Sequence, residues 1–314
     1  MNEAGMSGTP FFFGINYEMS EGFFVLNPLQ QHDILFDFNG VSNVENSENT
    51  VPDFSFESFP EDFSTYQKRF EKVMHGLHCG ESHLVNLTIK TPVKSSLSLH
   101  DIFMHSRTMY RLYLPATFVC FSPETFVKIS NGRICTYPMK GTIAAGIENA
   151  TDIILNNHKE IAEHRTSVDS LCNDLRKIAT NVKVNRFRYI DTLQTNKGEI
   201  LQVSSEIEGT LPENHLESIG TLIFKLLPAG SISGEPKAAT LNIIREAEQE
   251  LRGYYTGIAG YFDGKSLDTC VLIRFIEQQN NALFFRSGSG ITVNSICENE
   301  YSEAIRKIYL PFFR

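Results

Sequence analysis

Segments with the pattern of β-strands follow one another in groups along this chain and do not alternate one for one with helical segments. Strands are expected at 11–17, 22–26, 83–90, 116–121, 125–129 and 133–137, and a long helix follows at 152–179. A doubly wound parallel sheet needs a helix between successive strands. The order therefore predicts an α+β chain, in which large mixed or antiparallel sheets pack together and are covered by helices.

The later part of the chain continues this pattern without a linker. Further strands are expected at 182–192, 199–207 and within 254–293, and further helices at 61–79, 100–110, 214–226, 236–251 and 298–309. No Pro- or Gly-rich stretch divides the sequence, so we expect one domain over 1–314, which opens with a strand-rich segment of about residues 1–60. Ser, Asn and Glu gather between 42 and 58, which predicts a flexible surface loop.

Composition excludes several classes of protein. The net charge is -9, from 28 Lys plus Arg against 37 Asp plus Glu, whereas nucleic-acid binders usually carry a basic surplus. No stretch reaches the roughly 18 apolar residues of a membrane span, and the start lacks the pattern of a signal peptide. The 6 Cys form no C-x-x-C pair, so we expect a reducing cytoplasm and no disulfide framework. With 24 Phe and no Trp, Phe must supply most aromatic packing.

One candidate for chemistry is the segment Tyr137-Pro138-Met139-Lys140-Gly141-Thr142. A strand is expected to end at Pro138, and Gly141 frees the backbone after it, so that Lys140 would project from a strand end. A lysine amine is a nucleophile when burial or nearby cations favour its neutral form. A surface lysine beside a turn explains this short segment equally well.

Two pairs of glutamates share a spacing that suits a metal. Glu160 and Glu163 lie three residues apart in a predicted helix, which places both carboxylates on one face. Glu300 and Glu303 repeat the spacing in the final helix, with Lys307 one turn further on. Two such pairs could face each other across one hard divalent cation such as magnesium. On local sequence alone, solvated helix faces are the commoner explanation.

Glycine-rich segments and one arginine suggest anion binding. Residues 228–237 run into a helix, and free backbone amides there could hold an anion, as could those of 288–290 after a strand. Arg274 lies among apolar residues of a predicted strand over 271–275, which invites a carboxylate partner. An exposed strand face is the alternative for Arg274.

Ten short motifs between about Gly80 and Lys307 occur in an order that resembles the chorismate-utilising enzymes. This family comprises the large subunits of anthranilate, aminodeoxychorismate, isochorismate and salicylate synthases. The motifs are GESHLVNLT, FSPETF, YPMKGT, HKEIAEH, SSEIEG, PAGSISGEPK, RGYYTGIAGY, LIRF, GSGI and EYSEAIRK. The resemblance implies an anthranilate-synthase-like fold of large β-sheets covered by helices.

The resemblance also implies roles for individual residues. Glu124 matches the acid that protonates the departing ring hydroxyl of chorismate, and it must carry a proton beforehand. The residues that match the magnesium ligands are Glu160, Glu163, Glu300 and Glu303. The residues that match the substrate-binding groups are Thr142, Ser233, Gly234, Tyr255, Arg274, Gly288, Gly290 and Lys307. We assign no role to the histidines.

Two positions favour one branch of the family. Water-adding members carry a general-base lysine where this chain has Leu84, and an apolar side chain cannot activate water. The motif P-x-K-G-T, with Lys140, resembles aminodeoxychorismate synthases, in which the lysine forms a covalent intermediate that ammonia resolves. The resemblance thus implies synthesis of 4-amino-4-deoxychorismate for 4-aminobenzoate and folate, with ammonia from a separate glutamine amidotransferase. Anthranilate synthase component I and a non-catalytic chorismate-binding subunit remain alternatives.

Two features depart from related enzymes. Gln202 stands where many amine-adding members have histidine, and glutamine cannot exchange protons. This difference argues against pyruvate elimination more than against amination. The N-terminal region is short, which predicts that the tryptophan feedback site typical of anthranilate synthases is missing.

Overall fold

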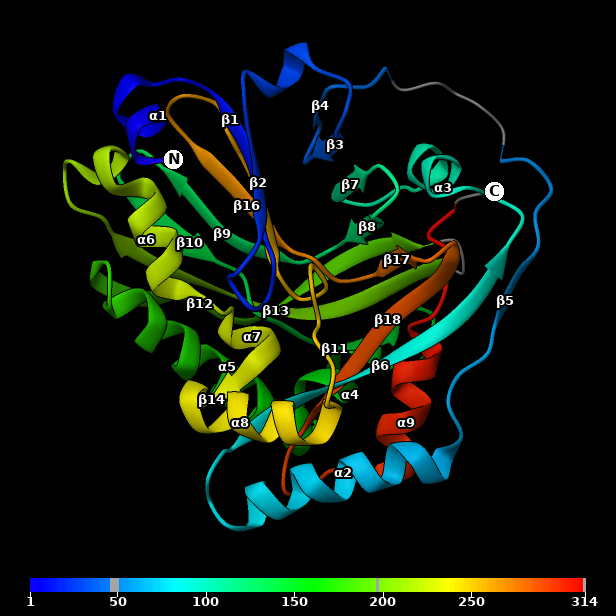
Figure 1. Cartoon of the computed structure of the whole chain (residues 1–314). Coiled ribbons are helices and arrows are strands. Elements are labelled where there is room, and N and C mark those ends of the chain that lie inside the picture. The colour runs from blue at the N-terminus through cyan, green and yellow to red at the C-terminus, as the bar shows by residue number, and fades with distance from the viewer. Residues whose placement is uncertain (46–50, 196–197, 313–314) are drawn as a thin grey trace.

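A computed structural model describes residues 1–45, 51–195 and 198–312, and within these ranges the chain forms two nine-stranded sheets (Figure 1). The first sheet has the order β11 (Met139–Ala144), β13 (Gly198–Thr210), β10 (Arg133–Thr136), β9 (Thr125–Ser130), β16 (Leu267–Val271), β15 (Ile258–Phe262), β1 (Phe11–Ile15) and β2 (Gly22–Leu26), with β12 (Thr180–Thr195) also paired to β13. The strand pairs of this sheet are antiparallel.

The second sheet contains the strands that carry the glycine-rich segments. Its order is β14 (Gly234–Glu235), β6 (Leu84–Ser95), β18 (Ala282–Ile291), β17 (Phe275–Gln279), β8 (Phe118–Ser122), β7 (Tyr110–Leu114), β3 (Leu35–Phe38) and β4 (Val41–Ser42), with β5 (Phe56–Ser58) also paired to β6. Its strand pairs are antiparallel as well. The α+β prediction is therefore confirmed.

Phenylalanine rings fill the space between the two sheets. Phe12 of β1 stacks on Phe36 of β3 with 4.3 Å between ring centroids. Phe118 and Phe275 stack at 4.6 Å, and all four rings belong to one buried cluster. Burying a side chain of this size stabilises the fold by about 1.5–3 kcal/mol, so these rings are a major part of what holds the sheets together.

Helices cover the outer faces of both sheets. On the first sheet lie α1 (Asn2–Ser7), α5 (His158–Arg176) and α6 (Ile219–Leu226), while α2 (Phe63–His78), α8 (Lys237–Glu248) and α9 (Cys297–Arg306) lie against β6 and β18 (Figure 1). In α2 the Asp62 side chain accepts the Thr65 N–H at the N-cap, and Tyr66, Phe70, Val73 and Leu77 form its buried face. None of the helices in the described ranges has the length and apolar character that crossing a membrane requires.

The predicted helix over 152–179 is in fact two helices, α4 (Ala150–Leu155) and α5. Asn156 ends α4, and the Asn157 side chain accepts the Glu160 N–H at the start of α5. Asparagine side chains compete for backbone groups in this way, and therefore favour helix ends over helix interiors. The interruption places Glu160 in the first turn of α5.

Other predicted boundaries also change. The helix expected at 100–110 is α3 (Leu99–His105), which ends before strand β7. The loop expected at 42–58 begins within β4 and ends with β5, and residues 46–50 of it lie outside the described residues. The strands expected at 11–17 and 22–26 correspond to β1 and β2, whereas β3, β4 and β5 were not predicted as individual strands.

Candidate active site

Lys140 is the second residue of β11, where it pairs with Val203 of β13. The prediction that a strand ends at Pro138 is wrong, because β10 ends at Thr136 and a new strand begins at Met139. Gly141 does adopt a left-handed conformation, with φ of +74°, at an irregularity in the β11–β13 pairing. A Cβ atom at Gly141 would lie 3.0 Å from Glu160 Oε2, so glycine lets the carboxylate of α5 approach the strand beside Lys140.

Lys307, at the end of α9, contacts two further predicted residues. Its Nζ donates to Glu303 Oε1 at 2.7 Å and to the Gly288 carbonyl of β18 at 2.7 Å. Burial lowers the pKa of Lys307, Glu303 partly offsets this, and the positive charges of Arg274 and Lys140 lower the pKa further. Arg274 and Lys140 thus both lie within electrostatic range of Lys307, and we call these three residues, which come from separate elements of the fold, the cationic cluster.

Arg274 does not lie in a strand, contrary to the prediction. It occupies the bend between β16 and β17, with φ of 54°, where the chain passes from one sheet to the other. Its carbonyl accepts the Phe121 N–H at 3.0 Å, and its Nε donates to the Tyr309 hydroxyl at 3.4 Å. In the part of the chain that the structure describes, Arg274 contacts this ring and no carboxylate. The guanidinium is thus held by its backbone and by Tyr309.

The glycine-rich segment is more ordered than predicted. Residues 230–233 form the short helix α7 (Gly230–Ser233), and Gly234 begins the pairing of β14 with β6. The N–H groups of Ser233 and Gly234 already donate to Ala229 and Gly230 carbonyls, so the prediction of free amides is wrong for both residues. A Cβ at Gly234 would lie 1.8 Å from the Leu84 carbonyl oxygen, which only glycine tolerates.

Glu124 lies in the turn between β8 and β9 and contacts the glycine-rich segment. Ser231 Oγ of α7 donates to Glu124 Oε1 at 2.7 Å. The backbone of Glu124 is fixed on both sides, since its N–H donates to Ser122 Oγ and its carbonyl accepts the Val271 N–H. The predicted acid is therefore positioned by both sheets and by α7.

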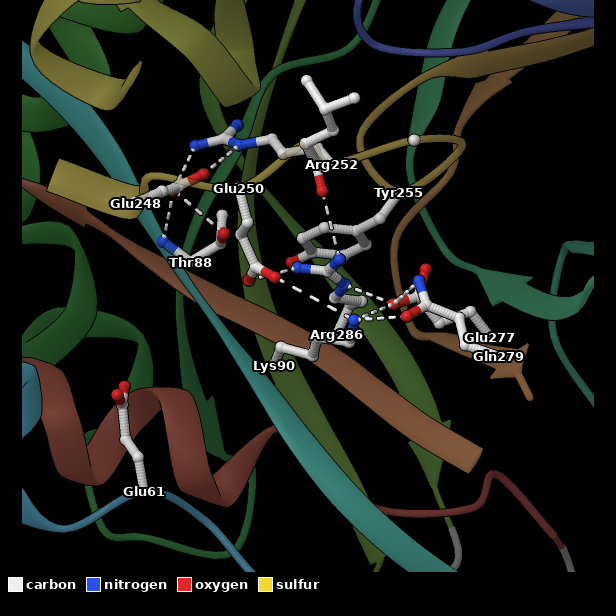
Figure 2. A network of polar contacts seen from close by, with 12 residues as sticks. Glu61, Thr88, Lys90, Glu248, Glu250, Arg252, Tyr255, Glu277, Gln279 and Arg286 are labelled. Carbon is white, nitrogen blue, oxygen red and sulfur yellow. Dashed lines mark hydrogen bonds and ion pairs between the residues drawn. The ribbon is translucent and has the colours of Figure 1, made fainter. Parts of the chain in front are cut away.

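A buried network of hydrogen bonds and ion pairs contacts the glycine-rich segment (Figure 2). The guanidinium of Arg252 donates to Glu248, to the Asn86 carbonyl of β6 at 2.7 Å and to the Ile232 carbonyl of α7 at 3.1 Å. Figure 2 also shows Arg286 bound to Glu250 and Glu277. Arg252 thus ties α8 to β6 and to the glycine-rich segment.

Tyr255 lies beside this network and is 3% exposed. Burial raises its pKa to about 12, although the nearby charges of Arg252 and Arg274 act in the opposite direction. The phenol is therefore neutral at physiological pH.

Gly290 pairs with Asn86 of β6, and a Cβ at Gly290 would lie 3.2 Å from Leu84 Cδ1. Thr142 is exposed on β11, opposite Gln202.

The four glutamates lie on α5 and α9 as predicted, in different surroundings. Glu300 is 3% exposed and accepts the Ser295 hydroxyl at 2.8 Å, whereas Glu303 accepts Lys307. Glu163 lines a cavity of about 520 Å³ together with Leu84, Thr166 and Thr292. Carboxylate oxygens fit magnesium chemically. Over the described ranges, however, no three His, Cys, Asp or Glu side chains are grouped so as to hold a metal, so the magnesium site stays a prediction.

His164 is a neighbour of Lys140 that the sequence did not single out. It is 0% exposed, and its Nε2 lies 2.6 Å from Ser205 Oγ. Burial, and then the charges of Arg188 and Lys140, lower its pKa to about 4, so the imidazole is neutral near pH 7. His164 lies in the motif HKEIAEH and Ser205 lies in the motif SSEIEG, so these motifs were the sequence signal that could have pointed to the pair.

Known proteins share both the sequence and the fold of this chain. A PabA-like protein of Haemophilus influenzae, described as uncharacterized, is 47% identical over 99% of this chain and 94% of its own length. Aminodeoxychorismate synthase component 1 of Bacillus subtilis is 29% identical over 78% of this chain and 54% of its own length.

Two solved structures have the same architecture. A putative 2,3-dihydroxybenzoate-specific isochorismate synthase of Bacillus anthracis matches 98% of this chain and 84% of its own, with a TM-score of 0.72 and 20% identity. Anthranilate synthase component I of Streptococcus pneumoniae matches 82% of this chain and 59% of its own, with a TM-score of 0.69 and 25% identity.

The family model of the chorismate binding enzymes matches residues 26–311, which include every candidate site residue described above. The order of motifs, the two packed sheets and this match agree with one another. The chain belongs to the chorismate binding enzyme family.

Proposed function

We propose that this chain is the large subunit of an aminodeoxychorismate synthase, which converts chorismate and ammonia to 4-amino-4-deoxychorismate. The observation that carries the proposal is the position of Lys140, which lies half-buried beside the cationic pair Arg274 and Lys307. A lysine amine can act as a covalent nucleophile at this position, and the neighbouring positive charges suit a substrate with two carboxylates.

In this proposal the substrate lies between the cationic cluster and Glu124. Arg274 and Lys307 hold its carboxylates, with Tyr255, Gly288, Gly290, Ser233, Gly234 and Thr142 around it. Lys140 attacks the ring, the C–O bond to the ring hydroxyl breaks, and Glu124 gives its proton to the hydroxyl, which leaves as water. Ammonia then displaces the lysine amine, and the enolpyruvyl group stays on the product.

A magnesium ion held by Glu160, Glu163, Glu300 and Glu303 would add positive charge at the ring carboxylate and help to polarise the leaving group. Carboxylates on two helices, one of them lining the large cavity, support this assignment. Leu84 also lines that cavity and is 9% exposed, and an apolar side chain there argues against activation of water as the nucleophile.

The ammonia would come from a glutamine amidotransferase partner. A relative that is named PabA-like and another that is named a component 1 support a two-part enzyme. We place the reaction in the cytoplasm, in the supply of 4-aminobenzoate for folate.

The test is a product assay of the purified chain with chorismate, magnesium and ammonium chloride. Formation of 4-amino-4-deoxychorismate, identified by mass, is the expected result. Fluorescent anthranilate would assign the chain to the anthranilate synthases instead. Binding of chorismate without turnover, with the amidotransferase partner also present, would make it a non-catalytic subunit.

A further inference from the structure

A small cavity lies next to the Glu124–Ser231 hydrogen bond. It has a volume of about 10 Å³, and its lining residues are Leu84, Thr166, Ser167, Ser170, Gly230, Ser231 and Gly234, four of which carry hydroxyl groups. A cavity holds one water when it offers about 10–15 Å³ and two to four polar partners. Its size and its lining therefore fit a single water molecule.

Ser167 is the second observation that points to a ligand. This residue is 5% exposed, and its hydroxyl has no hydrogen-bond partner among the residues that the structure describes. A buried hydroxyl without a partner costs about 1–3 kcal/mol, which a bound water would relieve. Thr166, on the same helix, also lines the cavity, and its hydroxyl donates to the Ala162 carbonyl at 3.0 Å and can still accept a hydrogen bond.

The small cavity and the large one share two lining residues. Leu84 and Thr166 line both the 10 Å³ cavity and the 520 Å³ cavity that contains Glu163. On the other side, Ser231 reaches Glu124 at 2.7 Å. The Ser231 hydroxyl donates its hydrogen to Glu124. Its oxygen can therefore only accept a hydrogen bond from a water in the cavity.

We propose that the cavity formed by α5 and α7 holds a structural water, and that this water and Ser231 return a proton to Glu124 after each turnover. The inference rests on the proposed role of Glu124 as the acid. Glu124 loses its proton when the ring hydroxyl leaves as water. The Ser231 hydroxyl then passes its proton to Glu124, the bound water replaces that proton, and solvent in the large cavity restores the water. No oxidant, reductant or other reactant is needed.

The relay makes a specific kinetic prediction. Ser231→Ala should leave the first turnover nearly unchanged, because in the proposed mechanism Glu124 enters that turnover already carrying its proton. Later turnovers should be about tenfold slower, since positioned proton transfer contributes about 10²–10⁴-fold and solvent access replaces part of it. Rapid-quench assays with chorismate, magnesium and ammonium should show a burst of one product per enzyme, and the slow phase should show a larger solvent deuterium isotope effect than wild type.

Three variants control for folding and for simple positioning of Glu124. Ser231→Thr keeps the hydroxyl, so it should not show the burst of Ser231→Ala. Ser167→Ala should show a burst of the same kind but of smaller size than that of Ser231→Ala. Ser287→Ala removes another buried hydroxyl that has no partner in the described chain, on β18, and should behave as wild type. Equal slowing of first and later turnovers in Ser231→Ala would show that Ser231 only positions Glu124. Unchanged kinetics in that variant would also overturn the relay, whereas a wild-type chain without turnover would contradict the proposed function itself.

Discussion

Lys140 of β11 and Lys307 at the end of α9 lie close enough for the charge of Lys140 to lower the pKa of Lys307. Two like charges held together by the fold repel each other unless an anion or deprotonation relieves them. Lys140 belongs to the first sheet, and Lys307 ends a helix that covers the second sheet, so the two lysines meet only in the folded chain. This relationship is the physical basis of the proposed carboxylate site.

Lys140→Ala should abolish the covalent intermediate and lower amination on the order of 10³-fold or more, because the nucleophile is removed. Chorismate binding should weaken only modestly, since Arg274 and Lys307 remain. Intact-protein mass spectrometry of quenched reactions measures the adduct, and calorimetry measures binding. Lys140→Arg is the matched control, since it keeps the charge without a nucleophilic amine. Full turnover of Lys140→Ala with ammonium would remove the lysine from the mechanism.

Glu163→Gln and Glu303→Gln should each weaken magnesium binding by at least about tenfold and remove nearly all activity, because each loses a charged oxygen ligand. Titration calorimetry with magnesium chloride measures the affinity. Glu298→Gln is the matched control, since Glu298 is exposed on the same helix α9 and is not a predicted ligand. If the three variants bind magnesium equally well, the glutamates are not the metal site.

Arg252→Met should destabilise the chain by about 3–5 kcal/mol, because it leaves the Glu248 carboxylate buried without its partner. Both side chains of this pair are only 1% exposed. The variant should also lose activity at temperatures where it stays folded, since the contacts to Asn86 and Ile232 that hold β6 and α7 are gone.

Arg286→Met provides the comparison for this prediction. Arg286 is 2% exposed and has two carboxylate partners. Glu250 is 36% exposed and can be solvated, and Glu277 keeps Lys90 as a cationic neighbour at 3.5 Å, so the loss of stability should be smaller. Urea denaturation with activity assays on the folded fraction separates the two effects. Equal losses of specific activity in both variants would contradict a positioning role for Arg252.

His164 should make stability depend on pH below its ordinary pKa of 6.5, because its folded pKa is about 4. The unfolded chain takes up the proton first, so stability is fully present above pH 6.5 and is lost as pH falls toward 4. At pH 5 the loss is about 2 kcal/mol. Urea midpoints at pH 7.5 and pH 5 without magnesium should differ less for His164→Gln than for wild type.

The exposed His100 offers a control for this pH effect. His100→Gln should keep the pH dependence of the wild type, because its imidazole is solvated in both states. A His164→Gln variant that keeps the full pH dependence would show that other groups cause it.

The sequence by itself determined the family and the fold class, and it supplied the candidates for the reactive groups. Periodicity located most strands and helices, because apolar residues on one face must be buried. The order of motifs singled out Lys140, Glu124 and the four glutamates, because chemistry depends on residue type. Even the aromatic core followed from the Phe content, and Phe12 does stack on Phe36.

Only the tertiary structure decided which of these groups meet. Local patterns do not specify the hydrogen bonds and backbone geometry that decided three features of the site. These features are the paired amides of Ser233 and Gly234, the bend at Arg274 and the start of β11 at Met139. The contacts of Ser231 with Glu124 and of His164 with Ser205 join segments far apart in the chain. Such contacts result from how sheets and helices pack, and packing is a property of the whole chain.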